Sequence, residues 1–352
     1  MIDLSVFFRT RSDSIEVFVT GLSLTFTKLI REEIDTSLTD SWANRTRWIG
    51  DTIEKYVPNI SSMPHIVLDC RMENFYMNQI GRSVINRFNL LPSQTKILTT
   101  VDPKDTLLNY EVEIDLLSQS NYCNFYDNLV AEKIDWKNIE IDIPVISLSG
   151  RATENRARLT RDLIDISKGR ARISFGGTTH YSLSEQDIKK FKDILYPHPF
   201  PVQIETDNKV LESILTQHNP PGNQLYRSLL AIVNETNDFN IPNIYLSEKS
   251  FKFFAWHQIP LFVAAPGHVD TMRKLGFDMF DDIVDHSYDT AKNAHVHKTM
   301  VLNAISKFLK EYPNLDDINR LRREVWDRLE ANENLLADFN NNKKYESWTV
   351  YG

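Results

Sequence analysis

Residues 145–175 read VISLSGRATENRARLTRDLIDISKGRARISF, and this stretch decides the fold class. A short apolar run at 145–148 is followed by polar residues and then by a helical pattern that carries Leu159 and Leu163 on one side. A second apolar run at 172–175 ends before two glycines. Strand, helix and strand in this order predict a βαβ unit with parallel strands.

The same alternation continues on both sides of this unit. Apolar runs at 226–234 and 260–264 predict two further strands of a doubly wound sheet. Nearer the N-terminus, the patterns predict strands at 2–8, 14–19, 66–69 and 96–100, and helices at 22–35, 42–57 and 78–88. The fold class is therefore expected to be α/β, with a C-terminal amphipathic helix over 315–339.

Length and composition fit two domains. The chain has 352 residues, of which 41% are hydrophobic and 25% charged, as is typical of globular proteins. The pattern predicts an N-terminal α/β domain at 1–141, a second α/β domain at 142–312, and a C-terminal helix and tail at 313–352. Two Rossmann-like domains that face a cleft, as in the GT-B architecture, fit this organisation, and composition alone does not distinguish them from other two-domain α/β enzymes.

Charge and cysteine content exclude several classes of protein. The net charge of −8 argues against a chain that coats nucleic acid, which needs clustered Lys and Arg. Cys70 and Cys123 lie outside any CxxC spacing, so we expect neither a zinc site nor a disulfide framework. No apolar run is long enough to predict a membrane span, and Asp3 stands where a secretory signal carries positive charge. We expect a cytoplasmic protein.

Three arginines follow the first strand of the βαβ unit. Arg151, Arg156 and Arg158 lie between the end of that strand and the first turns of the next helix. Open α/β sheets bind ligands at this edge, where helix N-termini and guanidinium groups favour a diphosphate. The alternative is a basic surface helix whose arginines pair with Glu154 and Asp162.

Two later segments add polar groups at strand ends. Glu235 and Thr236 follow the run at 229–233, where a carboxylate can accept ribose hydroxyls or remain a solvated loop acid. Ser247 is a candidate helix N-cap. Three charged residues follow it, namely Glu248, Lys249 and Lys252. A lysine in the first turn of a helix is unfavourable for the helix dipole, and an anion in front of the helix would explain it. The alternative is a polar helix start that binds no ligand.

A turn follows the strand expected at 260–264. Pro266 and Gly267 permit close backbone approach to a ligand, and His268 next to them is more typical of a helix start than of catalysis. Two further segments follow at 275–280 and 285–289, reading LGFDMF and DHSYD.

Taken in order, these segments resemble nucleotide-sugar glycosyltransferases of the fucosyltransferase and exostosin type. The C-terminal domain of that type carries a Glu, a Ser/Thr-Glu-Lys segment and a hydrophobic strand. The layout over about residues 145–290 is closer still to a group of uncharacterised phage and bacterial proteins. The chain departs from that group in two regions. Phe253 stands where Pro is usual and residues 256–260 lack the Gly that usually precedes the strand, and in the closing segment His286 stands where an acid is usual.

The resemblance assigns roles to the residues above. It implies that Glu235 and Glu248 contact the ribose or the sugar of a nucleoside diphosphate sugar. It also implies that Arg151, Arg156 and either Lys249 or Lys252 hold the diphosphate. The domain at 142–312 would then bind the donor, with no tightly bound cofactor, and the domain at 1–141 would bind the acceptor. The chain contains no Asp-x-Asp, so we expect transfer without a metal ion.

The general base is expected in the N-terminal domain. Asp69 and Glu73 follow the run at 66–68, and Asp102 follows the run at 98–101. A carboxylate at such a strand end can deprotonate an acceptor hydroxyl, although acids are common there without catalysis.

These observations predict a glycosyltransferase that moves a sugar from a nucleoside diphosphate to a hydroxyl acceptor. The acceptor is a glycan, a lipid-linked sugar, a protein or a modified nucleic-acid base. The alternative is a non-catalytic binding or structural protein that retains the fold. A nucleotide-dependent epimerase ranks last, because no Gly-x-Gly-x-x-Gly follows the first strand.

Overall fold

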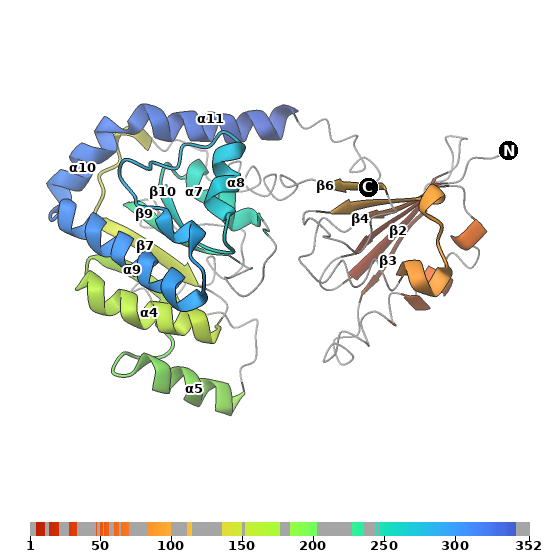
Figure 1. Ribbon diagram of the computed structural model, residues 1–352, viewed down its shortest axis with the longest axis horizontal. Coiled ribbons are helices and arrows are strands. Elements are labelled where there is room, and N and C mark those ends of the chain that lie inside the picture. Colours follow the sequence, from red (N-terminus) through yellow and green to blue (C-terminus); the bar gives the residue numbers. More distant parts are fainter. Residues whose placement is uncertain are drawn as a thin grey trace. The chain divides into compact units, whose positions relative to one another are not determined.

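The computed structural model describes residues 5–10, 14–20, 28–33, 47, 50–51, 53–55, 60–62, 65–69, 84–99, 111–114, 136–149, 152–176, 184–202, 227–235, 244 and 246–342. The chain divides into two compact units (Figure 1). The first comprises Met1–Gln119 with Lys344–Gly352, and the second comprises Ser120–Lys343. The sequence predicts a boundary between residues 141 and 142, whereas this division falls between residues 119 and 120.

The first unit contains a mixed six-stranded sheet in the order β3-β2-β1-β4-β5-β6. Its strands are β1 (Ser5–Thr10), β2 (Ser14–Thr20), β3 (Lys28–Glu33), β4 (His65–Asp69), β5 (Thr95–Thr99) and β6 (Glu111–Ile114). β1, β2 and β3 pair antiparallel, whereas β4, β5 and β6 continue from β1 as parallel strands. Short 3-10 turns lie at Ile60–Ser62 and Pro92–Gln94.

One expected helix of the first unit is wrong. The helix predicted over 22–35 is replaced in part by β3, in which Ile30 pairs with Val17 and Leu29 with Phe18 of β2. Leu29 and Ile30 alone fit the apolar spacing of a helix as well as that of a strand. Hydrogen bonding to β2 makes this segment a strand. The helix expected over 78–88 is helical at 84–88, and several described residues of 42–57 are helical.

The second unit contains a four-stranded parallel sheet in the order β10-β9-β7-β8. Its strands are β7 (Ile143–Ser149), β8 (Ala171–Phe175), β9 (Ser228–Asn234) and β10 (Ile259–Val263). Every residue of β9 is buried, as expected for a central strand covered on both faces. The prediction of an α/β fold with a parallel sheet is confirmed.

Helices cover both faces of this sheet. They are α4 (Glu154–Ser167), α5 (Glu185–Leu195), α7 (Glu248–Ala255), α8 (His268–Lys274), α9 (Ala294–Glu311), α10 (Leu315–Glu324) and α11 (Trp326–Asn342). α4 packs on β8 and α9, whereas α7 packs on β9, β10 and α11. Figure 1 shows α4 and α9 on one side of the sheet and α7 and α11 on the other. Trp136–Asn138 and Ser287–Thr290 form 3-10 turns.

The segment predicted as one helix over 315–339 forms two helices. α10 ends at Glu324 and α11 begins at Trp326, with Val325 between them. α11 packs on α7, and Phe339 contacts the ring of Phe277 at 5.8 Å between centroids. This segment is therefore part of the second unit and helps to cover its sheet.

Candidate functional site

The strand order places a topological switch point between β7 and β9. The chain passes from β7 to β8 on one side and from β9 to β10 on the other. The connections that leave the carboxyl ends of the two central strands therefore diverge, through α4 on one face and α7 on the other. Open α/β sheets bind their ligands at such a point.

Arg156 joins the two sides of the switch point. Thr153 caps α4 by accepting a hydrogen bond from the Arg156 backbone N–H at 3.4 Å. The Arg156 side chain, which is half-buried, donates from Nη2 to the backbone carbonyls of Glu235 at 2.6 Å and Asn234 at 3.2 Å. The first turn of α4 is thereby tied to the end of β9. The structure brings together Arg156 and Glu235, which the sequence assigned to one site.

The other arginines of α4 are paired on its surface. Arg158 donates to the Glu154 carboxylate at 2.7 Å, and Lys190 of α5 binds the same carboxylate at 2.7 Å. Hydrogen bonds from Lys190 and from Arg158 lower the pKa of the exposed Glu154 to about 2. Arg161 pairs with Asp162. These contacts match the surface-helix alternative for Arg158.

The Glu235 carboxylate is buried and faces α7. Its Oε2 accepts a hydrogen bond from Ser247 Oγ at 2.7 Å, and its Oε1 accepts one from Ser250 Oγ. All three side chains are at most 1% exposed. Ser247 also caps α7 by accepting from the Lys249 backbone N–H at 3.2 Å. The carboxylate therefore anchors the first turn of α7 to the end of β9.

His268 extends this network to the next strand end. Its Nε2 lies 3.1 Å from Ser250 Oγ, and its ring packs on Phe262 of β10. The Ser250 hydroxyl has one proton and donates it to Glu235, so His268 is the donor in this contact, through Nε2–H. Burial lowers the pKa of His268, and the carboxylates of Glu235 and Asp289 oppose that shift.

The two lysines of α7 have different surroundings. Lys249 lies in the first turn, at the carboxyl edge of the sheet, and is half-buried. Lys252 lies with Nζ 4.9 Å from the Trp256 ring and 5.5 Å from the Phe253 ring. Trp256 follows α7 at its opposite end, so the Lys252 ammonium group is directed away from the carboxyl edge.

Pro266 and Gly267 lead from β10 into α8. Gly267 has φ +85 and precedes the first residue of α8, and a Cβ there would lie 3.4 Å from the Ile244 side chain. The Gly267 N–H donates to the backbone carbonyl of Asp289 at 3.1 Å. The positive φ of Gly267 therefore positions the start of α8 next to Ile244 and Asp289 of the same chain.

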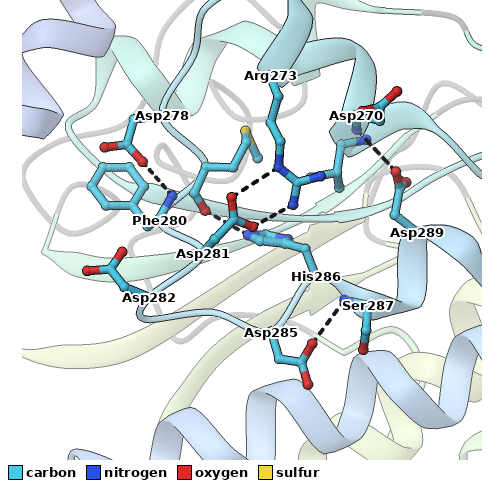
Figure 2. A network of polar contacts seen from close by, with 12 residues as sticks. Asp270, Arg273, Asp278, Phe280, Asp281, Asp282, Asp285, His286, Ser287 and Asp289 are labelled. Atoms are coloured by element: carbon cyan, nitrogen blue, oxygen red, sulfur yellow. Dashed lines mark hydrogen bonds and ion pairs between the residues drawn. The ribbon is translucent and has the colours of Figure 1, made fainter.

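The segment at 285–289 supports this edge of the sheet (Figure 2). The two carboxylate oxygens of Asp289 accept from the Val269 and Asp270 N–H groups at 3.1 Å each, which satisfies the first turn of α8. Figure 2 shows the bond from Asp270. Tyr288 Oη accepts from the Phe262 N–H at 3.1 Å and bonds His286 Nδ1 at 2.8 Å. His286, which departs from the acid of the resembling group, is therefore a structural residue here.

Arginine–aspartate pairs surround that segment. Arg328 of α11 binds Asp278 at 2.6 Å and Asp282 at 2.8 Å, and these hydrogen bonds raise its pKa. Figure 2 shows Arg273 directed at the Asp281 carboxylate, to which its Nε donates at 3.0 Å. The acidic residues of 278–282 are thus neutralised largely by arginines of neighbouring helices.

Several predicted site residues cannot be placed in this arrangement. Arg151, Thr236, Glu73 and Asp102 lie outside the described residues. Asp69 is the last residue of β4 and Glu248 is the first residue of α7, but only their backbones are described.

Sequence reasoning did not single out the side chains of Asn234 and Ser250 individually. Asn234 ends β9 and is 5% exposed, and Ser250 is fully buried. The sequence contains a signal for each residue. Asn234 is the polar end of a strand that is otherwise apolar after Ser228, and Ser250 lies three residues after the N-cap Ser247.

Comparisons of the chain with protein-family models, with curated proteins and with solved structures find no match. Within the described ranges, no group of three or more His, Cys, Asp or Glu side chains is arranged to hold a metal ion. Among the helices that the structure describes, none is both long enough and apolar enough to cross a membrane.

Proposed function

We propose that the chain is a glycosyltransferase whose second unit binds a nucleoside diphosphate sugar at the carboxyl edge of its parallel sheet. The observation that carries the proposal is Arg156, which lies in the first turn of α4 and reaches across the switch point to the end of β9. Helix N-termini and guanidinium groups at this edge favour a diphosphate. The residue order that resembles nucleotide-sugar glycosyltransferases supports sugar transfer as the reaction.

In this proposal the diphosphate lies between the first turns of α4 and α7. Arg156 and Lys249 place positive charge on either side of the switch point, and charge at the leaving diphosphate is neutralised without a metal ion. A base from the first unit, for which Asp69, Glu73 and Asp102 are the candidates, accepts the proton of the acceptor hydroxyl. The bond from the anomeric carbon to the diphosphate breaks as the bond to the acceptor oxygen forms.

The second candidate is a non-catalytic nucleotide-binding protein with the same fold. It is favoured by the positions of Arg158 and Lys252, because one pairs with Glu154 and the other lies over Trp256 rather than at the edge. A chain that kept the fold but lost turnover would tolerate such rearrangement of expected phosphate-binding groups.

Calorimetry against UDP, GDP, UDP-glucose, GDP-mannose, dTDP-glucose and CMP-sialic acid tests donor binding. We expect one donor to bind, and we expect Arg156→Gln to weaken it at least tenfold, or about 1.4 kcal/mol. Arg161→Gln is the matched control, because Arg161 lies on the same helix but pairs with Asp162.

Absence of binding by every donor would exclude the proposal. Binding without release of the nucleoside diphosphate, in the presence of varied hydroxyl acceptors, would favour the non-catalytic candidate. Release that depends on an acceptor would establish transfer.

A further inference from the structure

Asn234 carries an unsatisfied polar atom at the switch point. The residue ends β9 and is 5% exposed, and its Oδ1 has no hydrogen-bond partner among the described residues. Its Nδ2 donates to Ser147 Oγ of β7 over a long 3.4 Å. An unpaired buried amide oxygen costs stability, and such groups in native structures usually have a functional or solvent partner.

The side chains of Asn234 and Glu235 face opposite sides of the sheet. The strand pairing continues through Glu235, whose N–H donates to the Val263 carbonyl at 3.1 Å. Successive side chains of a strand alternate between faces. Glu235 contacts Ser247 and Ser250 of α7, so Asn234 lies on the face that α4 and α9 cover.

The backbone carbonyls and the carboxylate next to Asn234 Oδ1 have hydrogen-bond partners. Arg156 occupies the backbone carbonyls of both Asn234 and Glu235, and the two serines occupy both oxygens of the Glu235 carboxylate. Oδ1 is an acceptor only, so its missing partner is a donor. A hydroxyl group can supply this donor. Arg156, which suits a phosphate, lies beside Asn234, so a ligand that carries both a hydroxyl and a phosphate fits this position.

We infer that Asn234, rather than Glu235, accepts a hydrogen bond from a hydroxyl group of the bound nucleotide sugar. The inference rests on the proposed function and names the residue that recognises the carbohydrate part of the ligand. Because Oδ1 is covered in the unliganded chain, binding includes a local opening at this edge. The bond then forms away from water, where it is stronger than at an exposed oxygen.

Asn234→Leu tests the inference, because leucine has the same number and branching of side-chain heavy atoms but no polar group. Asn234→Ala is the second variant and removes the amide without adding apolar bulk. Asn332→Leu is the matched control. Asn332 is 3% exposed, and its carboxamide accepts from the Asp278 N–H and donates to the Asp278 carbonyl at 2.8 Å each.

Thermal unfolding without ligand and calorimetry with UDP, GDP, UDP-glucose and GDP-mannose are then measured for all four proteins. Asn332→Leu should lower the Tm by roughly 4–8 °C, since it removes two satisfied buried bonds, and leave the Kd unchanged. Asn234→Leu should keep or raise the Tm yet weaken binding about tenfold or more, and Asn234→Ala should weaken binding similarly.

The probes distinguish two sources of the hydroxyl. Equal losses for UDP and UDP-glucose, or for GDP and GDP-mannose, assign the bond to the ribose. A loss confined to the sugar conjugates assigns it to the transferred sugar.

Binding by both Asn234 variants within twofold of the unaltered chain would overturn the inference while leaving the proposed function intact. A Tm loss in Asn234→Leu as large as in Asn332→Leu would also overturn it, because the amide would then be structural. Absence of binding by the unaltered chain would remove the proposed function and the inference together.

Discussion

Arg156 donates to the backbone carbonyl of Glu235 at 2.6 Å, which fastens the first turn of α4 to the end of β9. Its Nη2 also reaches the Asn234 carbonyl. The contact crosses the point where the connections of the sheet diverge, and it adds a side-chain link to the backbone pairing of β7 with β9. Its removal therefore affects both stability and the proposed ligand site.

Arg156→Ala should lower the free energy of unfolding by about 1–3 kcal/mol, because two carbonyls near the core lose a charged donor. Denaturant unfolding measures the change, and Arg161→Ala should cost about 1 kcal/mol or less, because Asp162 keeps its ion pair with Lys298. Equal effects of the two substitutions would show that the Arg156 contact has no special importance.

Glu235 and Ser250 should be energetically coupled. Glu235→Gln replaces one acceptor oxygen by a donor, so one serine hydroxyl loses its partner in a fully buried position. We expect a loss of about 1–3 kcal/mol, and a double-mutant cycle with Ser250→Ala should give a coupling of about 0.5–3 kcal/mol. Additive losses would contradict a shared network.

Tyr288→Phe should destabilise the second unit without changing its shape. The hydroxyl joins the Phe262 N–H of edge strand β10 to His286 Nδ1, and both groups are buried. Its removal leaves a donor and an acceptor unpaired, at a cost of about 1–3 kcal/mol. Thermal unfolding measures this loss, and Thr290→Val, which removes an exposed hydroxyl bonded to the Ser287 carbonyl, provides the comparison.

Acidification from pH 7 to pH 5 should destabilise the second unit through His268 and His286. Burial lowers the pKa of each below 6.5, so the unfolded chain binds more protons than the folded chain as the pH falls below that value. Stability is thus present at neutral pH and is lost on acidification, by at most about 1.4 kcal/mol per pH unit for each histidine.

The carboxylates titrate in a different range. Hydrogen bonds from Arg328 hold the pKa of Asp282 below 3.8. Burial raises the pKa of Asp278, but the hydrogen bonds from Arg328 and from the Phe280 N–H, together with the charge of Arg328, lower it below its usual value, so these pairs persist at pH 5. His286→Gln should flatten the stability profile between pH 7 and pH 5. An unchanged profile in that variant would show that His286 does not contribute to it.

The sequence by itself determined the α/β class and most of the second sheet. Short apolar runs marked β7, β8, β9 and β10. The signal was clearest for the central strand β9, because such a strand is covered on both faces and is therefore almost entirely apolar. Ser247 was recognised as the cap of α7 from its position before a helical pattern. Local chemistry was sufficient for these features.

Tertiary structure alone decided which polar side chains meet and which are used internally. Lys28–Glu33 became a strand because β2 offered hydrogen-bond partners, although its spacing also suited a helix. The sequence grouped Glu235 with Arg156, but it could not show that both Glu235 oxygens bind serines or that Asn234 Oδ1 has no partner among the described residues. Hydrogen bonding between distant segments depends on the packing of whole helices and strands, and spacing along the chain does not encode that geometry.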